Sequence, residues 1–149
     1  MTALARWRSL EPARRRLLWQ AVAALCVAAL KVRFLPFPRI AAWLGTMQPP
    51  RPDVAEVSAR PEETARARDI RWAIAAAARR LPFECACLTR ALAAHSIALA
   101  EGLAPTLHMG AEPGQRGTAE THAWLTAAGV GVTGFPLGPR IVEIGCFYG

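Results

Sequence analysis

A cysteine and a histidine of this chain stand in settings that suit thiol chemistry. Cys87 opens the run Cys-Leu-Thr-Arg-Ala, and His122 opens the run His-Ala-Trp further along the chain. A thiol is mostly protonated at neutral pH, so a cysteine that attacks a carbonyl carbon needs a neighbour that favours the thiolate. The pair therefore predicts acyl transfer by a Cys87 nucleophile with His122 as its base.

The cysteine is predicted to begin a helix. Residues 87–101 are rich in Ala and Leu at helical spacing, and they follow Pro82. At a helix N-terminus, the unpaired backbone N–H groups and the macrodipole stabilise an anion by about 0.3–1 kcal/mol. That position favours the thiolate of Cys87, and the remaining activation must come from the histidine.

The histidine is predicted to lie on a strand. The segment Thr121-His-Ala-Trp-Leu-Thr alternates between two faces, which puts His122 and Trp124 on the same side. A strand histidine can face a cysteine at a helix start. The alternative from these residues alone is that Cys87 is a small buried side chain and that His122 is a hydrogen-bonded core histidine.

Helices precede strands along the chain. A helix is expected from Pro61 to Leu81, because two glutamates follow the proline and apolar residues then recur at helical spacing. Strands are expected at residues 106–109, 121–127 and 130–133, the last two joined near Ala128-Gly129. This order predicts an α+β fold. The polar segment 110–118 is predicted to be a surface loop, with a gate over the substrate cleft as the alternative.

The chain divides by composition. We predict an N-terminal helical arm at residues 1–45, a proline-rich linker at 46–60 and a catalytic core at 61–149. The net charge of +7 comes from the first 40 residues, which hold eight Arg and Lys against one Glu. This arm has no stacking-aromatic or helix-turn-helix pattern, so nucleic acid is not expected as a partner.

The apolar stretch of the arm is predicted to be a buried helix. Residues 17–30 are uncharged and mostly apolar, but this run is shorter than the roughly 18–20 residues that span a bilayer. Peripheral contact with a membrane is the minor alternative. No small-residue cleavage site follows the stretch, so a cytoplasmic location is expected.

The four cysteines show no regular spacing. Cys85 and Cys87, with His122 and Cys146, could offer four ligands to zinc, but a C-x-C pair is a weak metal signal in a chain with enough apolar residues for its own core. We therefore predict no metal and no cofactor. Reduced thiols are expected, with a Cys85 to Cys87 bridge as an open alternative that would block catalysis.

Several segments resemble the lasso peptide biosynthesis proteins of the microcin-processing type. They are Leu17-Leu-Trp-Gln-Ala, Lys31-Val-Arg-Phe-Leu-Pro-Phe-Pro-Arg39, the helix from Arg66 to Leu81 with Pro82, Cys87-Leu-Thr-Arg-Ala-Leu, Gly102-Leu, His108-Met-Gly and His122-Ala-Trp-Leu. The resemblance implies a transglutaminase-like, papain-related cysteine protease that removes the leader of a ribosomal precursor peptide. It also implies a separate ATP-dependent cyclase, which joins the freed amine to an acidic side chain as a lactam. On this resemblance Cys87 is the nucleophile and His122 is the base.

The chain departs from the family at the acidic residue that should orient the imidazole. Such enzymes are expected to carry an Asp downstream of the histidine, yet residues 125–142 contain no acid. Glu143 is the first acid after His122, so it is predicted to be the third catalytic residue. The alternatives are that Glu143 lies on a solvated strand, and that a backbone carbonyl or a hydroxyl such as Thr133 fixes the tautomer.

Residues 1–60 show no leader-recognition module of the kind that fused members of the family carry. We therefore expect a separate small leader-binding protein to deliver the precursor peptide, with the basic arm as its docking surface. Three functions remain open: a leader peptidase, a thiol acyltransferase of the transglutaminase type, and a catalytically weak scaffold of a peptide-maturation complex.

Overall fold

The fold places five helices before four strands in the part of the chain that the computed structural model describes, residues 2–50, 59–114 and 117–149. The helices are α1 (Ala3–Ser9), α2 (Pro12–Phe34), α3 (Phe37–Leu44), α4 (Pro61–Ala78) and α5 (Cys87–Ala100). The strands are β1 (Thr106–Pro113), β2 (Ala119–Ala127), β3 (Val130–Thr133) and β4 (Val142–Tyr148). This arrangement is an α+β fold, as the order of elements in the sequence predicts.

The strands form one antiparallel sheet in the order β3-β2-β1-β4. The turn between β2 and β3 uses Ala128 and Gly129, both with positive φ, at the position predicted from the sequence. β1 continues to Pro113 because it pairs with β2 as far as Ala119, so residues 110–113 of the predicted loop are strand instead. Residues 115–116 of that loop lie outside the described part of the chain.

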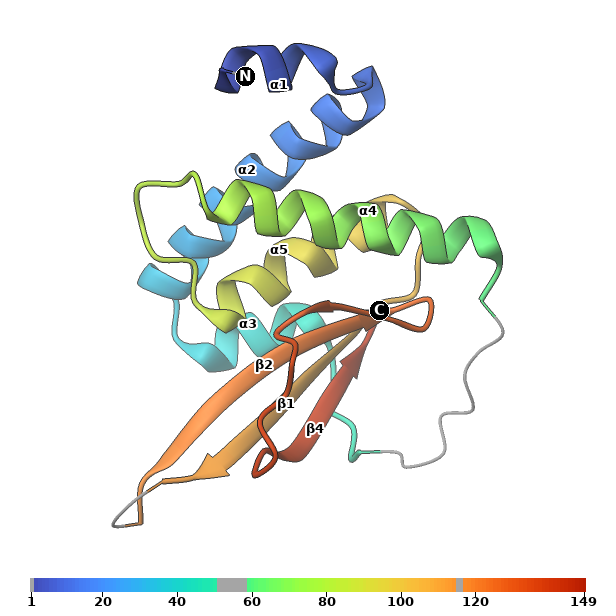
Figure 1. Cartoon of the computed structure of the whole chain (residues 1–149). Helices are drawn as coiled ribbons and strands as arrows, with labels where there is room; N and C mark the ends of the chain where they lie inside the picture. Colours follow the sequence, from blue (N-terminus) through green and yellow to red (C-terminus); the bar gives the residue numbers. More distant parts are fainter. Residues whose placement is uncertain (1, 51–58, 115–116) are drawn as a thin grey trace.

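α4 and α5 pack on one face of the sheet, α2 packs on these two helices, and the β1–β2 hairpin extends beyond them (Figure 1). α4 and α5 carry many alanines, which allow helices to approach closely. On the sheet, the largest core side chains are Leu107, Leu125 and Phe147, which lie opposite one another in register. In the described residues, a hydrophobic core therefore lies between the helices and one face of the sheet.

α2 belongs to this core. It contributes Leu18 and Leu25, and it packs against both α4 and α5. Full burial of a leucine side chain contributes about 1.5–3 kcal/mol. The predicted N-terminal arm thus shares its core with the predicted catalytic part, while most of the predicted linker lies outside the described residues.

The other face of the sheet carries a different set of side chains. Successive residues of a strand point to opposite faces, so His122 and Trp124 point away from the face that holds Ala123 and Leu125. The chain after β3 follows this second face: Gly134 lies against Trp124, and farther along Arg140 forms an ion pair with Glu112 of β1 at 2.9 Å. We call this surface the outer face.

Candidate functional site

Cys87 is the first residue of α5, which confirms the predicted helix start. Ala86 is the N-cap and offers no side chain to the free amides of the first turn. Arg90 Nε donates to the carbonyl oxygen of Cys85 at 2.9 Å and so ties the preceding residues to the first turn of the helix. The sulfur of Cys87 is half-buried at a helix terminus that favours an anion.

His122 is half-buried on β2, and a backbone carbonyl fixes its tautomer. Its Nε2 lies 2.9 Å from the carbonyl oxygen of Gly134. A carbonyl oxygen only accepts hydrogen bonds, so Nε2 carries the hydrogen and Nδ1 of the neutral ring keeps a free lone pair. The ring also stacks on Trp124, with centroids 5.9 Å apart. Of the alternatives to Glu143 given above, a backbone carbonyl is thus the group that hydrogen-bonds His122 in the structure.

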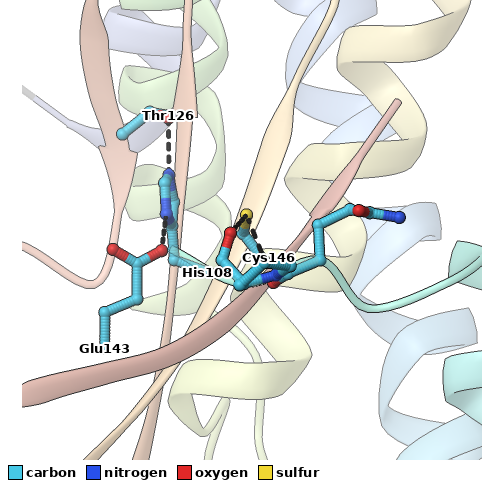
Figure 2. A network of polar contacts seen from close by, with 6 residues as sticks. His108, Thr126, Glu143 and Cys146 are labelled. Carbon is cyan, nitrogen blue, oxygen red and sulfur yellow. Dashed lines mark hydrogen bonds and ion pairs between the residues drawn. The ribbon is translucent and has the colours of Figure 1, made fainter. Parts of the chain in front are cut away.

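Glu143 pairs with His108 and not, as predicted, with His122. Its Oε1 lies 2.6 Å from Nδ1 of His108 on β1 (Figure 2). A carboxylate only accepts, so Nδ1 carries the hydrogen, and Nε2 shares a hydrogen bond with the hydroxyl of Thr126 across 2.8 Å. The predicted pairing of Glu143 with His122 is therefore absent.

The reason lies in the sheet. Gly110 of β1 stands between the two residues, because it pairs with His122 on one side and with Glu143 on the other. Because Gly110 has no side chain, the Glu143 carboxylate could extend over it toward His122, but the indole ring of Trp124 fills that space. A Cβ at Gly110 would lie only 2.8 Å from Cζ3 of this ring. Trp124 thus separates Glu143 from His122.

His108 is the residue that sequence reasoning did not assign to the site. Its ring lies parallel to that of Trp124, with centroids 5.3 Å apart, so Trp124 stacks on both histidines. The alternation of residues 106–109 and 121–127 was visible in the sequence and could have suggested outward-pointing positions for His108 and Trp124. Which strands are neighbours, and in which register, was not visible.

The predicted nucleophile and base are not joined by a hydrogen bond in the described part of the chain. Cys87 packs against the core on the helix side of the sheet, whereas His122 shares the outer face with Trp124. Within residues 2–50, 59–114 and 117–149, the sulfur of Cys87 makes no hydrogen bond. Catalysis by this pair needs a hydrogen bond between the imidazole and the sulfur, which the described residues do not show.

The neighbouring thiol is less suited to nucleophilic attack. Cys85 is buried, and burial raises the pKa of its thiol, although the Arg90 guanidinium partly offsets this effect. A protonated, buried thiol is a poor nucleophile. All four cysteines are free, so Cys85 and Cys87 form no bridge. No three His, Cys, Asp or Glu side chains of the described residues are placed to hold a metal ion.

Two hollows lie away from Cys87 and His122 on the described residues. One of about 770 Å³ lies between α2 and α4 and is lined by charged residues that include Arg14 and Asp69. A second, of about 460 Å³, lies at the end of the β1–β2 hairpin beside Arg140. Neither of these two hollows is lined by Cys87 or His122.

A family model connects these observations. The model described as the transglutaminase-like superfamily matches residues 31–141, which include Cys87, His122 and Gly134. Neither the curated proteins nor the solved structures yield a match. This superfamily match indicates an enzyme of cysteine peptidase or acyltransferase type. The matched segment covers most of the chain, and the chain belongs to the transglutaminase-like superfamily.

Proposed function

We propose that this protein is a cysteine peptidase that removes the leader peptide from a ribosomally made lasso peptide precursor. The observation that carries the proposal is the hydrogen bond from His122 Nε2 to the Gly134 carbonyl, because it leaves Nδ1 as a base. The superfamily match supports thiol acyl transfer, and the resemblance of the quoted sequence segments to lasso peptide biosynthesis proteins supports the leader as the substrate.

The chemistry takes two steps. The thiolate of Cys87 attacks the carbonyl carbon at the end of the leader, the C–N bond breaks, and protonated His122 gives its proton to the departing amine. A water molecule, deprotonated by His122, then hydrolyses the thioester and returns the free thiol. The free amides at the start of α5 stabilise the thiolate. An amine in place of water would make the same enzyme an acyltransferase.

The proposal needs a hydrogen bond between His122 and the thiol of Cys87 when the precursor is bound. What holds His122 in its present place is one hydrogen bond, which contributes about 0.5–1.5 kcal/mol, and one stacked pair, which contributes a similar amount. Binding energy from the precursor can offset that cost, and catalytic hydrogen bonds often tighten only when substrate is bound. We propose that a small leader-binding protein delivers the precursor and that an ATP-dependent cyclase uses the freed amine, all in the cytoplasm.

Cleavage of a candidate precursor, with the leader-binding protein added, tests the proposal. The reaction is followed by mass spectrometry for the wild type, Cys87→Ala and His122→Ala, with Cys85→Ala as the matched control for a lost thiol two residues away. Loss of Cys87 or His122 should lower the rate by at least about 100-fold, while Cys85→Ala should cleave. Equal cleavage by the wild type and Cys87→Ala would refute a peptidase that depends on this thiol.

A scaffold role is the second candidate, and one observation favours it. Cys87 makes no hydrogen bond to His122 in the described part of the chain, and the histidine has a neutral carbonyl where its family is expected to supply an acid. A scaffold predicts that Cys87→Ala still supports maturation of the precursor in the complete mixture. If added hydroxylamine gives a hydroxamate at the cleavage site with the wild type alone, an acyl enzyme forms and the scaffold is excluded.

A further inference from the structure

α2 is apolar on two opposite sides. One side carries Leu18, Ala21, Leu25 and Ala28, which are buried in the core. The other side carries a row of exposed apolar residues, Trp19, Ala23, Val27, Leu30 and Phe34, which we call the outer stripe. Its members are spaced three or four residues apart, so they form one continuous line along the helix. Trp19 is 62% exposed and Phe34 is 72% exposed.

The surroundings of the outer stripe are basic. Arg16 lies one turn before Trp19 on the same line, and Lys31 and Arg33 lie near the other end. Lys31 Nζ lies 4.4 Å from the ring centroid of Trp43, an exposed tryptophan of α3, so a cation and an aromatic ring stand together beside the stripe. The whole net charge of the chain, +7, comes from this N-terminal region.

An aromatic and apolar stripe with flanking Arg and Lys is the composition of a helix that lies in the surface of an anionic membrane. α2 is also long and apolar enough to cross a bilayer, with 23 residues and a mean hydropathy of 1.6 over its most apolar window. Crossing would, however, pull Leu18 and Leu25 out of the core that they share with α4 and α5. An orientation in the plane of the membrane keeps that core intact and buries only the stripe.

We infer that the outer stripe of α2 docks this protein on an anionic membrane surface. The stripe enters the boundary between headgroups and acyl chains, and Arg16, Lys31 and Arg33 contact acidic headgroups. Residues 19–34 form about 24 Å of helix, and all members of the stripe face the membrane when this helix lies parallel to its surface. The charge of the region selects anionic lipid, and the apolar residues supply the affinity. This inference is independent of leader cleavage.

Flotation of the full-length protein with lipid vesicles tests the inference. Vesicles of phosphatidylcholine alone are compared with vesicles that contain about 30% phosphatidylglycerol, at low salt and at about 0.5 M salt, where surface charges are screened. The wild type should float with the anionic vesicles at low salt, and both the neutral lipid and the high salt should weaken binding by at least about tenfold.

Two matched variants separate the stripe from general hydrophobicity. Leu30→Gln/Phe34→Gln should bind anionic vesicles at least about tenfold more weakly than the wild type. Val142→Gln/Ile144→Gln removes two side chains of β4 that are comparably exposed, at 62% and 57%, and should bind like the wild type. Circular dichroism on each variant confirms that the fold is retained.

Several outcomes would overturn the inference. These are failure of the wild type to float, equal flotation with neutral and anionic vesicles, and unchanged binding by the stripe variant. Retention in the membrane after an alkaline carbonate wash would indicate a helix that spans the bilayer. A dimer that the stripe variant dissociates, in a protein that does not float, would assign the stripe to a second copy of the chain.

Discussion

The Gly134 carbonyl that holds His122 can be disturbed by a single methyl group. Gly134 has φ +81°, a conformation that costs a residue with a side chain about 1–2 kcal/mol. A Cβ at this position would also lie 2.6 Å from Cβ of Trp124 and 2.7 Å from the carbonyl oxygen of Ala123. Neither atom can rotate away, because one is backbone and the other is attached directly to it. Gly134→Ala must therefore shift the chain that carries the acceptor of His122.

Two terms add in the free energy of unfolding. The left-handed conformation contributes about 1–2 kcal/mol, and forcing a methyl group into filled space contributes about 1–3 kcal/mol, so Gly134→Ala should destabilise the fold by about 2–5 kcal/mol. Gly129 gives a matched control, because its φ is +73° but nothing lies within 4 Å of a Cβ there. Gly129→Ala should lower the free energy of unfolding only by the cost of the left-handed conformation, about 1–2 kcal/mol.

Urea unfolding and thermal melts of the three proteins measure the difference. At about 2–4 °C per kcal/mol, Gly134→Ala should melt about 2–12 °C below Gly129→Ala. Precursor cleavage should fall with Gly134→Ala and stay near the wild-type rate with Gly129→Ala, because only the first substitution moves the carbonyl that fixes the base. Equal stabilities of the two variants would show that the contacts around Gly134 are not as close as the structure places them.

Three further predictions concern other titrating groups. Burial lowers the pKa of His95, so the unfolded chain binds a proton at this residue more readily than the folded chain does. The free energy of unfolding should therefore fall as the pH drops below about 6.5. Urea titrations of His95→Leu should show a smaller fall. Iodoacetamide should modify half-buried Cys87 before buried Cys85, and peptide mass spectrometry that finds the reverse order would contradict the assigned burial. A double-mutant cycle of His108→Ala and Glu143→Gln should give a coupling energy of about 1–3 kcal/mol, whereas additive effects would show that the pair is not formed.

The local elements could be predicted because short-range patterns determine them. The acidic residues after Pro61 and the apolar spacing that follows are enough to indicate α4, whose start is stabilised by Glu63 bound to the backbone N–H of Arg60 at 3.0 Å. The start of α5 at Cys87 and the turn at Ala128-Gly129 were indicated in the same way. These features depend on neighbours within a few residues, which the sequence displays directly.

The partner of Glu143 could not be predicted because it depends on strand order and register. The prediction that Glu143 orients His122 rests only on distance along the sequence, because Glu143 is the first acid after His122. In the sheet, β1 lies between β4 and β2, so the histidine nearest to Glu143 is His108 of β1, which precedes it by 35 residues. A bulge between Met109 and Gly110 then sets which residues of β1 and β4 face each other. Neither the strand order nor the bulge leaves a pattern in one sequence.

The Gly134 carbonyl supports catalysis by His122 less than a carboxylate would. Both groups fix the tautomer of His122, but only a carboxylate also stabilises the positively charged imidazolium that forms as the thiol loses its proton. Adding an acid at the acceptor position would not restore this, because any side chain at Gly134 meets Trp124 and the Ala123 carbonyl. Glycine is therefore the residue that fits at position 134 without moving the backbone. In the proposed reaction, the start of α5 stabilises the thiolate but no acid stabilises the imidazolium, so the reaction should be slow.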